Sequence, residues 1–257
     1  MGASADGSAA GFVTRRAGDS LWLIGGLLLL WQAVALTAGP DALASPWRTI
    51  VKLGQMFTTT VFLGHIQETG EAFLIALAIA IVAGLAIGLL IGLHDLSARI
   101  AEPFLLAANS VPKIALYPIV LLIFGIGMPA KIAFGAIHGI VPVAIFTISG
   151  CRNVPPVLLK TARAMRLSRA DTVRSIVLPA SLPEIFTGIR IGVSLTLIGT
   201  ILGEMFGSQR GLGFLLMTAI GLQNTEVSMA VTLLLVVFAA TVSTALIALD
   251  RRLRRGG

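Results

Sequence analysis

Six apolar stretches, each close to the roughly 20 residues that cross a bilayer as a helix, constrain the fold of this chain most strongly. Only 12% of the 257 residues are charged, about half the fraction typical of soluble domains. The pattern predicts an all-α integral membrane protein. Its single transmembrane domain, 21–250, lies between an N-terminal segment, 1–20, and a basic tail, 251–257. The expected spans are 21–38, 72–93, 104–124, 132–149, 186–206 and 227–249.

The third span is the least regular of the six. Asn109, Pro112, Lys113 and Pro118 interrupt its apolar sequence. Proline lacks a backbone donor and disturbs a helix interior, and a lysine is costly in hydrocarbon.

The distribution of lysine and arginine predicts the orientation. If the N-terminus is cytoplasmic, the inner segments contain thirteen of these residues and the outer segments contain four, Arg48, Lys52, Lys131 and Arg210. Basic residues accumulate on the cytoplasmic side of membrane proteins. Both termini and the long loop 152–183 are therefore expected in the cytoplasm. The net charge of +7 reflects this topology and attraction to anionic lipid, and it does not indicate nucleic-acid binding.

The first span allows a second interpretation. Arg15 and Arg16 followed by an apolar run and the sequence ALTAG also fit a cleavable secretory signal. Cleavage would leave five spans and place the basic loop and the basic tail on opposite sides. Retention as the first helix is favoured because it keeps both on the inner side.

Loop 152–183 contains signals for two short helices. Pro155 and Pro156 open the first, in which Leu158, Ala162 and Met165 recur at helical spacing. The basic side chains Lys160, Arg163 and Arg166 share the opposite face. Ser168 and Asp171 form a capping-box pattern that starts the second helix, and this helix is expected to end at Pro179.

The same loop resembles the EAA loop of importer-type ABC transporter permeases. In that pattern, EAA is followed after three residues by Gly, and nine residues later by Ile, any residue, Leu and Pro. Ile176-Val177-Leu178-Pro179 of this chain matches the end of the pattern. Lys160 and Thr161 depart from the first two positions, and Arg166 stands where the family has Gly. Glycine tolerates a left-handed turn, so Arg166 implies a strained, different or absent turn. An ordinary loop beside lipid headgroups is the alternative.

Further segments are similar to the nitrate/sulfonate/taurine-type permeases, and the similarity covers 72–247. They are VPKIALYPIVLLIFGIGMPAKIAF from residue 111, LPEIFTGIRIG from 182 and GEMFGSQRGLGFLL from 203. The resemblance implies a type I importer permease in the bacterial inner membrane, paired with a second copy. It also implies two ATPase subunits and a periplasmic or lipid-anchored solute-binding protein as partners. The expected solute is a small organic or inorganic anion, although relatives also carry neutral and heterocyclic solutes.

The resemblance gives loop 152–183 a role as the coupling loop, the segment that contacts the ATPases. The residues expected to take part are Leu158, Lys160, Ala162, Arg163, Met165, Arg166, Ser168 and Asp171.

The chain's own chemistry agrees with a non-catalytic subunit. No glycine precedes any of the four lysines, so a GxxxxGK[ST] phosphate loop is absent from the sequence. ATP and Mg²⁺ are therefore expected on a partner, with no cofactor or metal in this chain. Hydrolase motifs and clustered histidines or carboxylates are also absent from the sequence. A secondary transporter would show inverted repeats and several buried acids, and a structural scaffold would not need a coupling loop.

Two sets of intramembrane residues are predicted. Glycines at four-residue spacing let helix backbones approach closely, and they are Gly84, Gly88, Gly92, Gly188, Gly192, Gly199 and Gly203. Polar or charged residues within spans are candidates for the translocation pathway, and they are Asn109, Lys113, Tyr117, His138, Thr196, Thr200 and Glu204. The alternatives are packing for His138, a gate or helix-end structure for Glu204 and an interfacial position for Lys113. Arg190 is expected to extend to the inner headgroups.

Overall fold

The computed structural model describes residues 6–39 and 42–255, and within them all side chains except those of 6–21, 95, 102, 108, 109 and 249–255. The described chain is all helical, as the sequence predicted. The helices are α1 (Asp6–Ala38), α2 (Pro46–Met56), α3 (Thr60–Gly92), α4 (Asp95–Ser110), α5 (Tyr117–Phe124), α6 (Met128–Arg152), α7 (Pro156–Ala164), α8 (Arg169–Thr172), α9 (Leu178–Gly207), α10 (Leu212–Gly221) and α11 (Thr225–Arg255).

Four helical segments of the described chain are long and apolar enough to cross a membrane: α3, α6, the continuous segment from α8 through α9, and α11. Within α1, the segment Trp22–Ala38, whose side chains are described, forms a shorter apolar helix. The helix that contains the second predicted span is longer than that span, because α3 starts at Thr60. Two further helices, α2 and α10, were not predicted.

The prediction of a continuous third span was wrong. The chain forms α4, then a 3₁₀ turn at Lys113–Leu116, then α5. Val111 takes an extended conformation, with φ −66° and ψ 131°. Pro112 explains the break, because a proline excludes its preceding residue from the helical region and offers no N–H to the helix.

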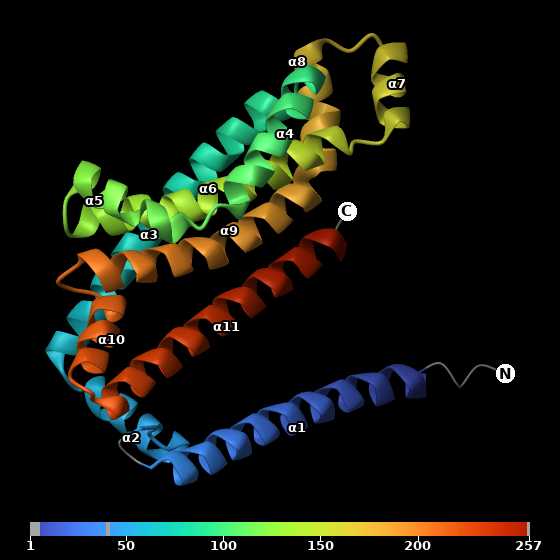
Figure 1. Cartoon of the computed structure of the whole chain (residues 1–257). Coiled ribbons are helices and arrows are strands. Elements are labelled where there is room, and N and C mark those ends of the chain that lie inside the picture. The colour runs from blue at the N-terminus through green and yellow to red at the C-terminus, as the bar shows by residue number, and fades with distance from the viewer. Residues whose placement is uncertain (1–5, 40–41, 256–257) are drawn as a thin grey trace.

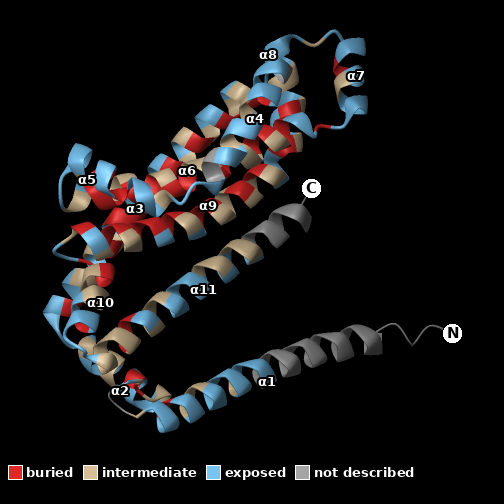
Figure 2. Cartoon of the chain, in the orientation of Figure 1, coloured by how far each residue is buried: buried red, intermediate tan, exposed pale blue. Residues whose placement is uncertain are grey.

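The centre of the fold is the packing of α6 between α3 and α9 (Figure 1). Buried residues concentrate on these three helices, whereas the described side chains of α1 are mostly exposed and those of α11 are mostly intermediate or exposed (Figure 2). On α1, Trp22 is 84% exposed. An apolar helix surface of this kind requires lipid or another protein as its neighbour.

The seven glycines predicted for helix packing are all buried, and all face α6. Gly84, Gly88 and Gly92 of α3 lie against Val143, Thr147 and Cys151. Gly188, Gly192, Gly199 and Gly203 of α9 lie against Phe146, Val143, His138 and Lys131. A Cβ atom at Gly84 would come within 2.6 Å of the Val143 Cβ, so the backbones approach too closely for any side chain.

We expect Gly88→Ala to destabilise the protein by about 1–3 kcal/mol, because its new methyl group collides with Thr147 and forces α3 and α6 apart. Thermal unfolding in detergent measures the effect. Gly70→Ala is the matched control on the same helix, since nothing lies within 4 Å of a Cβ there. Equal melting temperatures for the two variants would contradict close packing at Gly88.

Candidate functional site

The coupling loop extends from one end of the helix bundle, and α2, α5 and α10 lie at the opposite end (Figure 1). Its base is closed by Asn153, whose side-chain amide donates to Glu184 Oε1 at 2.8 Å and to Ser149 Oγ at 3.2 Å. Beside this contact, Cys151, Val154 and Val177 form a small apolar cluster. The loop is therefore fixed to both α6 and α9.

The turn after α7 uses a left-handed residue, as the EAA pattern requires, but supplies it with arginine. Arg166 has φ 53°. Its N–H donates to the Arg163 carbonyl at 3.0 Å, and the Leu167 N–H donates to the Ala162 carbonyl at 3.0 Å. These two bonds make a Schellman motif with Arg166 at the position where glycine is preferred. The left-handed conformation costs a non-glycine residue about 1–2 kcal/mol.

Arg166→Gly is accordingly expected to stabilise the coupling loop by about 1 kcal/mol, because glycine adopts the left-handed turn without this cost. Hydrogen exchange at the amides of α7 should become roughly fivefold slower. Arg163→Gly also removes an arginine, but from a regular helical position, and should make the same amides exchange faster. If the α7 amides exchanged faster in Arg166→Gly, this would contradict a strained left-handed conformation at Arg166.

The second short helix starts as predicted and ends elsewhere. Ser168 is the N-cap, its Oγ accepting from the Asp171 N–H at 3.1 Å and donating to Asp171 Oδ2 at 2.6 Å. The helix does not end at Pro179, because it passes through a π-helical turn, Val173–Val177, into α9. The Leu178 N–H donates to the Val173 carbonyl, and this wider register accommodates the proline that follows.

The predicted apolar stripe of α7 does not form one exposed face. Ala162 is only 2% exposed and faces the chain itself, whereas Met165 is 67% exposed and Leu158 is 38% exposed. Val157, also 67% exposed, was not predicted. Lys160, Arg163 and Arg166 are exposed around these residues. The surface open to a partner is therefore Val157, Leu158 and Met165 with a basic surround, which we call the coupling face.

Two of the predicted pathway threonines are packing residues in this structure. Thr196 and Thr200 are 0% exposed and lie against Gly139 and Gly135 of α6. Thr200 donates to the Thr196 carbonyl at 2.9 Å. The polar stripe of α9 thus faces protein and not water, so the prediction that these threonines line a pathway is corrected.

Tyr117 and His138 also pack inside the protomer. The Tyr117 hydroxyl donates to the Gly203 carbonyl at 2.6 Å, and both rings meet Phe134 edge to face. His138 Nδ1 lies 2.8 Å from the Phe134 carbonyl oxygen. Lys113 is half-buried in the 3₁₀ turn. The side chain of Asn109 lies outside the described residues.

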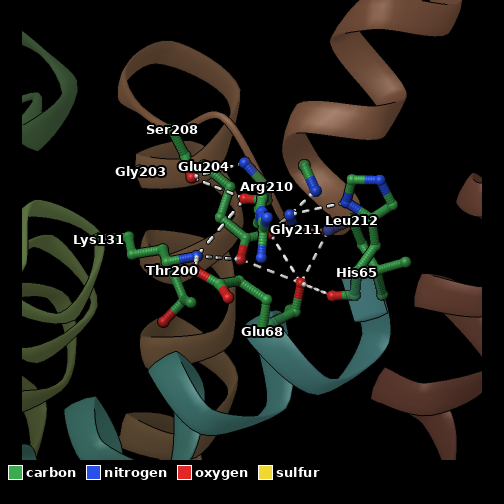
Figure 3. A network of polar contacts seen from close by, with 12 residues as sticks. His65, Glu68, Lys131, Thr200, Gly203, Glu204, Ser208, Arg210, Gly211 and Leu212 are labelled. Atoms are coloured by element: carbon green, nitrogen blue, oxygen red, sulfur yellow. Dashed lines mark hydrogen bonds and ion pairs between the residues drawn. The ribbon is translucent and has the colours of Figure 1, made fainter. Parts of the chain in front are cut away.

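A polar network at the end of the bundle opposite the coupling loop was missed (Figure 3). Lys131 was expected in an outer loop, but it lies in the first turn of α6 and is 0% exposed. Its Nζ forms ion pairs with Glu68 Oε1 at 3.0 Å and Glu204 Oε1 at 3.3 Å, and donates to the Arg210 carbonyl at 3.4 Å. The lysine therefore links α3, α6 and α9.

Glu204 is the most connected group of this network. Its carboxylate accepts from the Thr69 hydroxyl at 2.9 and 3.0 Å and from the Gly213 N–H at 2.9 Å, besides Lys131. Like Lys131 it is 0% exposed. Glu204 does not reach a pathway in this structure; the alternative of helix-end structure describes its position.

The network also fixes the turn before α10. The Gly211 N–H donates to His65 Nδ1 at 3.0 Å, and the Leu212 N–H donates to Thr69 Oγ1 at 2.8 Å. Gly211 has φ +114°, and a Cβ there would collide with the Glu204 carboxylate. The sequence signals for this site were Glu204, a charged residue within a predicted span, and the spacing of His65, Glu68 and Thr69, which share a helix face at i, i+3 and i+4.

Comparison with known proteins identifies the family. Residues 80–256 match the model of the binding-protein-dependent transport system inner membrane component. This chain belongs to that family. Its relatives are named as permease proteins, which are non-catalytic membrane subunits, in agreement with the absence of hydrolase motifs from the sequence.

Two curated relatives match this permease over most of its length. The taurine transport system permease protein TauC of Escherichia coli is 29% identical over 94% of this chain and 90% of its own length. A probable ABC transporter permease protein of Haemophilus influenzae is 31% identical over 84% of this chain and 88% of its own.

Solved structures support the same fold. The inward-facing MetNI methionine ABC transporter gives a TM-score of 0.66 at 21% identity, covering 75% of this permease and 95% of that chain. An amino acid ABC transporter gives 0.63 at 19% identity, covering 78% and 97%. The fold is that of an ABC importer permease.

Proposed function

We propose that two copies of this permease form the translocation pathway of an ABC importer, and that each coupling loop binds one of two ATPase subunits. The observation that carries the proposal is the coupling loop itself. It is a helix–turn–helix fixed at its base by Asn153 and Glu184, and it presents the exposed apolar residues Val157 and Met165 among basic side chains. Exposed apolar residues of this kind mark protein contacts.

The mechanism proposed is alternating access. ATP closes the ATPase subunits, and the coupling loops move with them. Because the helix from α8 to α9 is continuous, and α9 packs closely on α6, displacement of the loop is passed to the helices that carry the predicted pathway. The loop, the start of α1 and the end of α11 lie at the same end of the bundle, which fits the charge-based assignment of that end to the cytoplasm (Figure 1).

The solute proposed is a small anion delivered by a binding protein outside the membrane. Support comes from the named solutes of relatives, since taurine, nitrate and aliphatic sulfonates carry anionic groups. Melting temperatures of the binding protein with each of these compounds test the assignment, because a ligand that binds the folded state raises its melting temperature.

Affinity purification of the tagged permease from its own host tests the assembly. We expect a P-loop ATPase to be retained in equal amount with the permease, and the purified assembly to hydrolyse ATP. Recovery of the permease alone, combined with solute uptake driven by an ion gradient in proteoliposomes, would favour a secondary transporter and overturn the proposal.

A further inference from the structure

The coupling loop carries a large excess of positive charge. Residues 152–183 contain six basic side chains and one acidic side chain, a net charge of +5, against +7 for the whole chain. All six basic residues are exposed. The single acid, Asp171, is already engaged as part of a helix cap, because the Ser168 hydroxyl donates to its Oδ2 at 2.6 Å. A surface of this charge is complementary to an acidic partner.

The helix α7 presents Lys160 away from the rest of the protein. Ala162 is only 2% exposed and marks the side of α7 that faces the chain. Lys160 is two residues earlier, which places it about 200° around the helix from Ala162. It is exposed and shares its side of the helix with Val157, three residues earlier. Most of the surface of α7 is exposed in the same way (Figure 2).

Lys160 therefore belongs to the coupling face. Val157 lies one turn before it, and Ala164, also exposed, lies one turn after it. Among the residues that the structure describes, Lys160 has no ion-pair partner. An ammonium group within a protein contact loses water when the contact forms, and a charge buried in an interface is costly unless it is paired. The partner has to supply the opposite charge.

We propose that the surface of the ATPase that receives α7 carries an aspartate or glutamate, whose carboxylate pairs with Lys160 when the assembly forms. Val157 and Met165 pack on apolar groups of the same surface. An ATPase with a basic or apolar group at that place would leave the ammonium group buried without a partner, so Lys160 favours one ATPase over others. This inference rests on the proposed function, because it requires that the coupling loop bind an ATPase.

Anionic lipid headgroups are another source of negative charge at the cytoplasmic end of the bundle. The arrangement of α7 favours a protein partner. Its contacts are mainly with the turn Val173–Val177, and it stands apart from the membrane-crossing helices α3, α6 and α11 (Figure 1). The experiment therefore uses nanodiscs of phosphatidylcholine, which carries no net charge and removes anionic lipid as an explanation.

Cross-linking with a water-soluble carbodiimide tests the contact directly. The reagent activates a carboxylate, and a lysine amine in contact with it displaces the activating group, so that an amide bond forms and a urea is released. The reagent is added to the purified assembly of the permease with its ATPase. Lys160 is the only lysine of residues 152–183. We expect mass spectrometry to detect a peptide in which Lys160 is joined to an aspartate or glutamate of the ATPase.

Two substitutions at Lys160 separate its charge from its amine. Lys160→Arg keeps the positive charge, so it should retain the ATPase, but it should lose the cross-linked peptide because a guanidinium does not react in this way. Lys160→Glu should raise the Kd between the ATPase and the permease at least about tenfold, because like charges then meet. Arg48→Glu, at an exposed arginine of α2 at the opposite end of the bundle, is the matched control and should leave the Kd unchanged.

Three results would overturn the pairing. The first is an assembly that retains the ATPase but gives no cross-link at Lys160. The second is a Lys160→Glu variant that binds the ATPase as tightly as the unmodified permease in phosphatidylcholine; weaker binding only after phosphatidylglycerol is added would assign the charge to lipid. The third is an equal rise in Kd for Arg48→Glu, which would show a general effect of charge. Recovery of the unmodified permease without any ATPase is a separate result and would refute the proposed function instead.

Discussion

Lys131→Met is expected to destabilise the permease by about 3–5 kcal/mol, the usual consequence of removing one member of a buried ion pair. Lys131 and Glu204 are both 0% exposed and lie 3.3 Å apart. Methionine fills much of the same volume but leaves the Glu204 carboxylate buried without its cation. The remaining donors to Glu204, the Thr69 hydroxyl and the Gly213 N–H, are neutral. The melting temperature of the purified permease measures the loss.

Comparing the melting temperatures of Glu204→Gln and Lys131→Met tests whether the loss of stability comes from the buried carboxylate charge. Glutamine retains an oxygen for Thr69 and Gly213, and Lys131 keeps its ion pair with Glu68 at 3.0 Å. The loss should therefore be smaller than in Lys131→Met. The double variant Lys131→Met/Glu204→Gln has no buried carboxylate charge. Its destabilisation should therefore be smaller than the sum of the destabilisations of the two single variants. Lys160→Met, at an exposed lysine, should leave the melting temperature nearly unchanged. A similar loss in Lys160→Met and Lys131→Met would contradict a buried pair.

The sequence predicted those features that depend on neighbouring residues. Ser168 caps its helix because Asp171 is three positions away, and no distant contact is needed. Pro112 and Pro118 were recognised as interruptions of the third span, although the chain was still expected to cross as one helix. The break at Val111 follows from a steric rule between adjacent residues.

The sequence could not predict contacts between distant segments. Lys131 pairs with residues 63 and 73 positions away, so its spacing along the chain gives no signal. For Thr196 and Thr200 the helical period identified a shared polar face. The opposing Gly135 and Gly139 of α6 decide that this face packs inside the protomer. Ala162 fits the period of an exposed stripe, but it is only 2% exposed once the loop has folded.

The burial of Ala162 identifies Met165 as the informative position for the coupling contact. Met165→Asp should abolish co-purification of the ATPase, because a carboxylate on the coupling face would be buried unpaired at the interface, at a cost of several kcal/mol. Since Met165 is 67% exposed in the protomer, the melting temperature of the isolated permease should not change. Ala162→Asp is expected to lose the ATPase as well, but with faster hydrogen exchange in α7, because its charge is placed inside the loop.

Leu222→Asp is the matched control for Met165→Asp. It places the same carboxylate at an apolar side chain that is 75% exposed, directly after α10 at the opposite end of the bundle. The ATPase should remain bound to this variant. Met165→Asp that still purifies with stoichiometric ATPase would show that the ATPase does not contact the coupling face through Met165. A loss in both variants would show a general effect of the added charge on assembly, because only one of the two positions lies on the coupling loop.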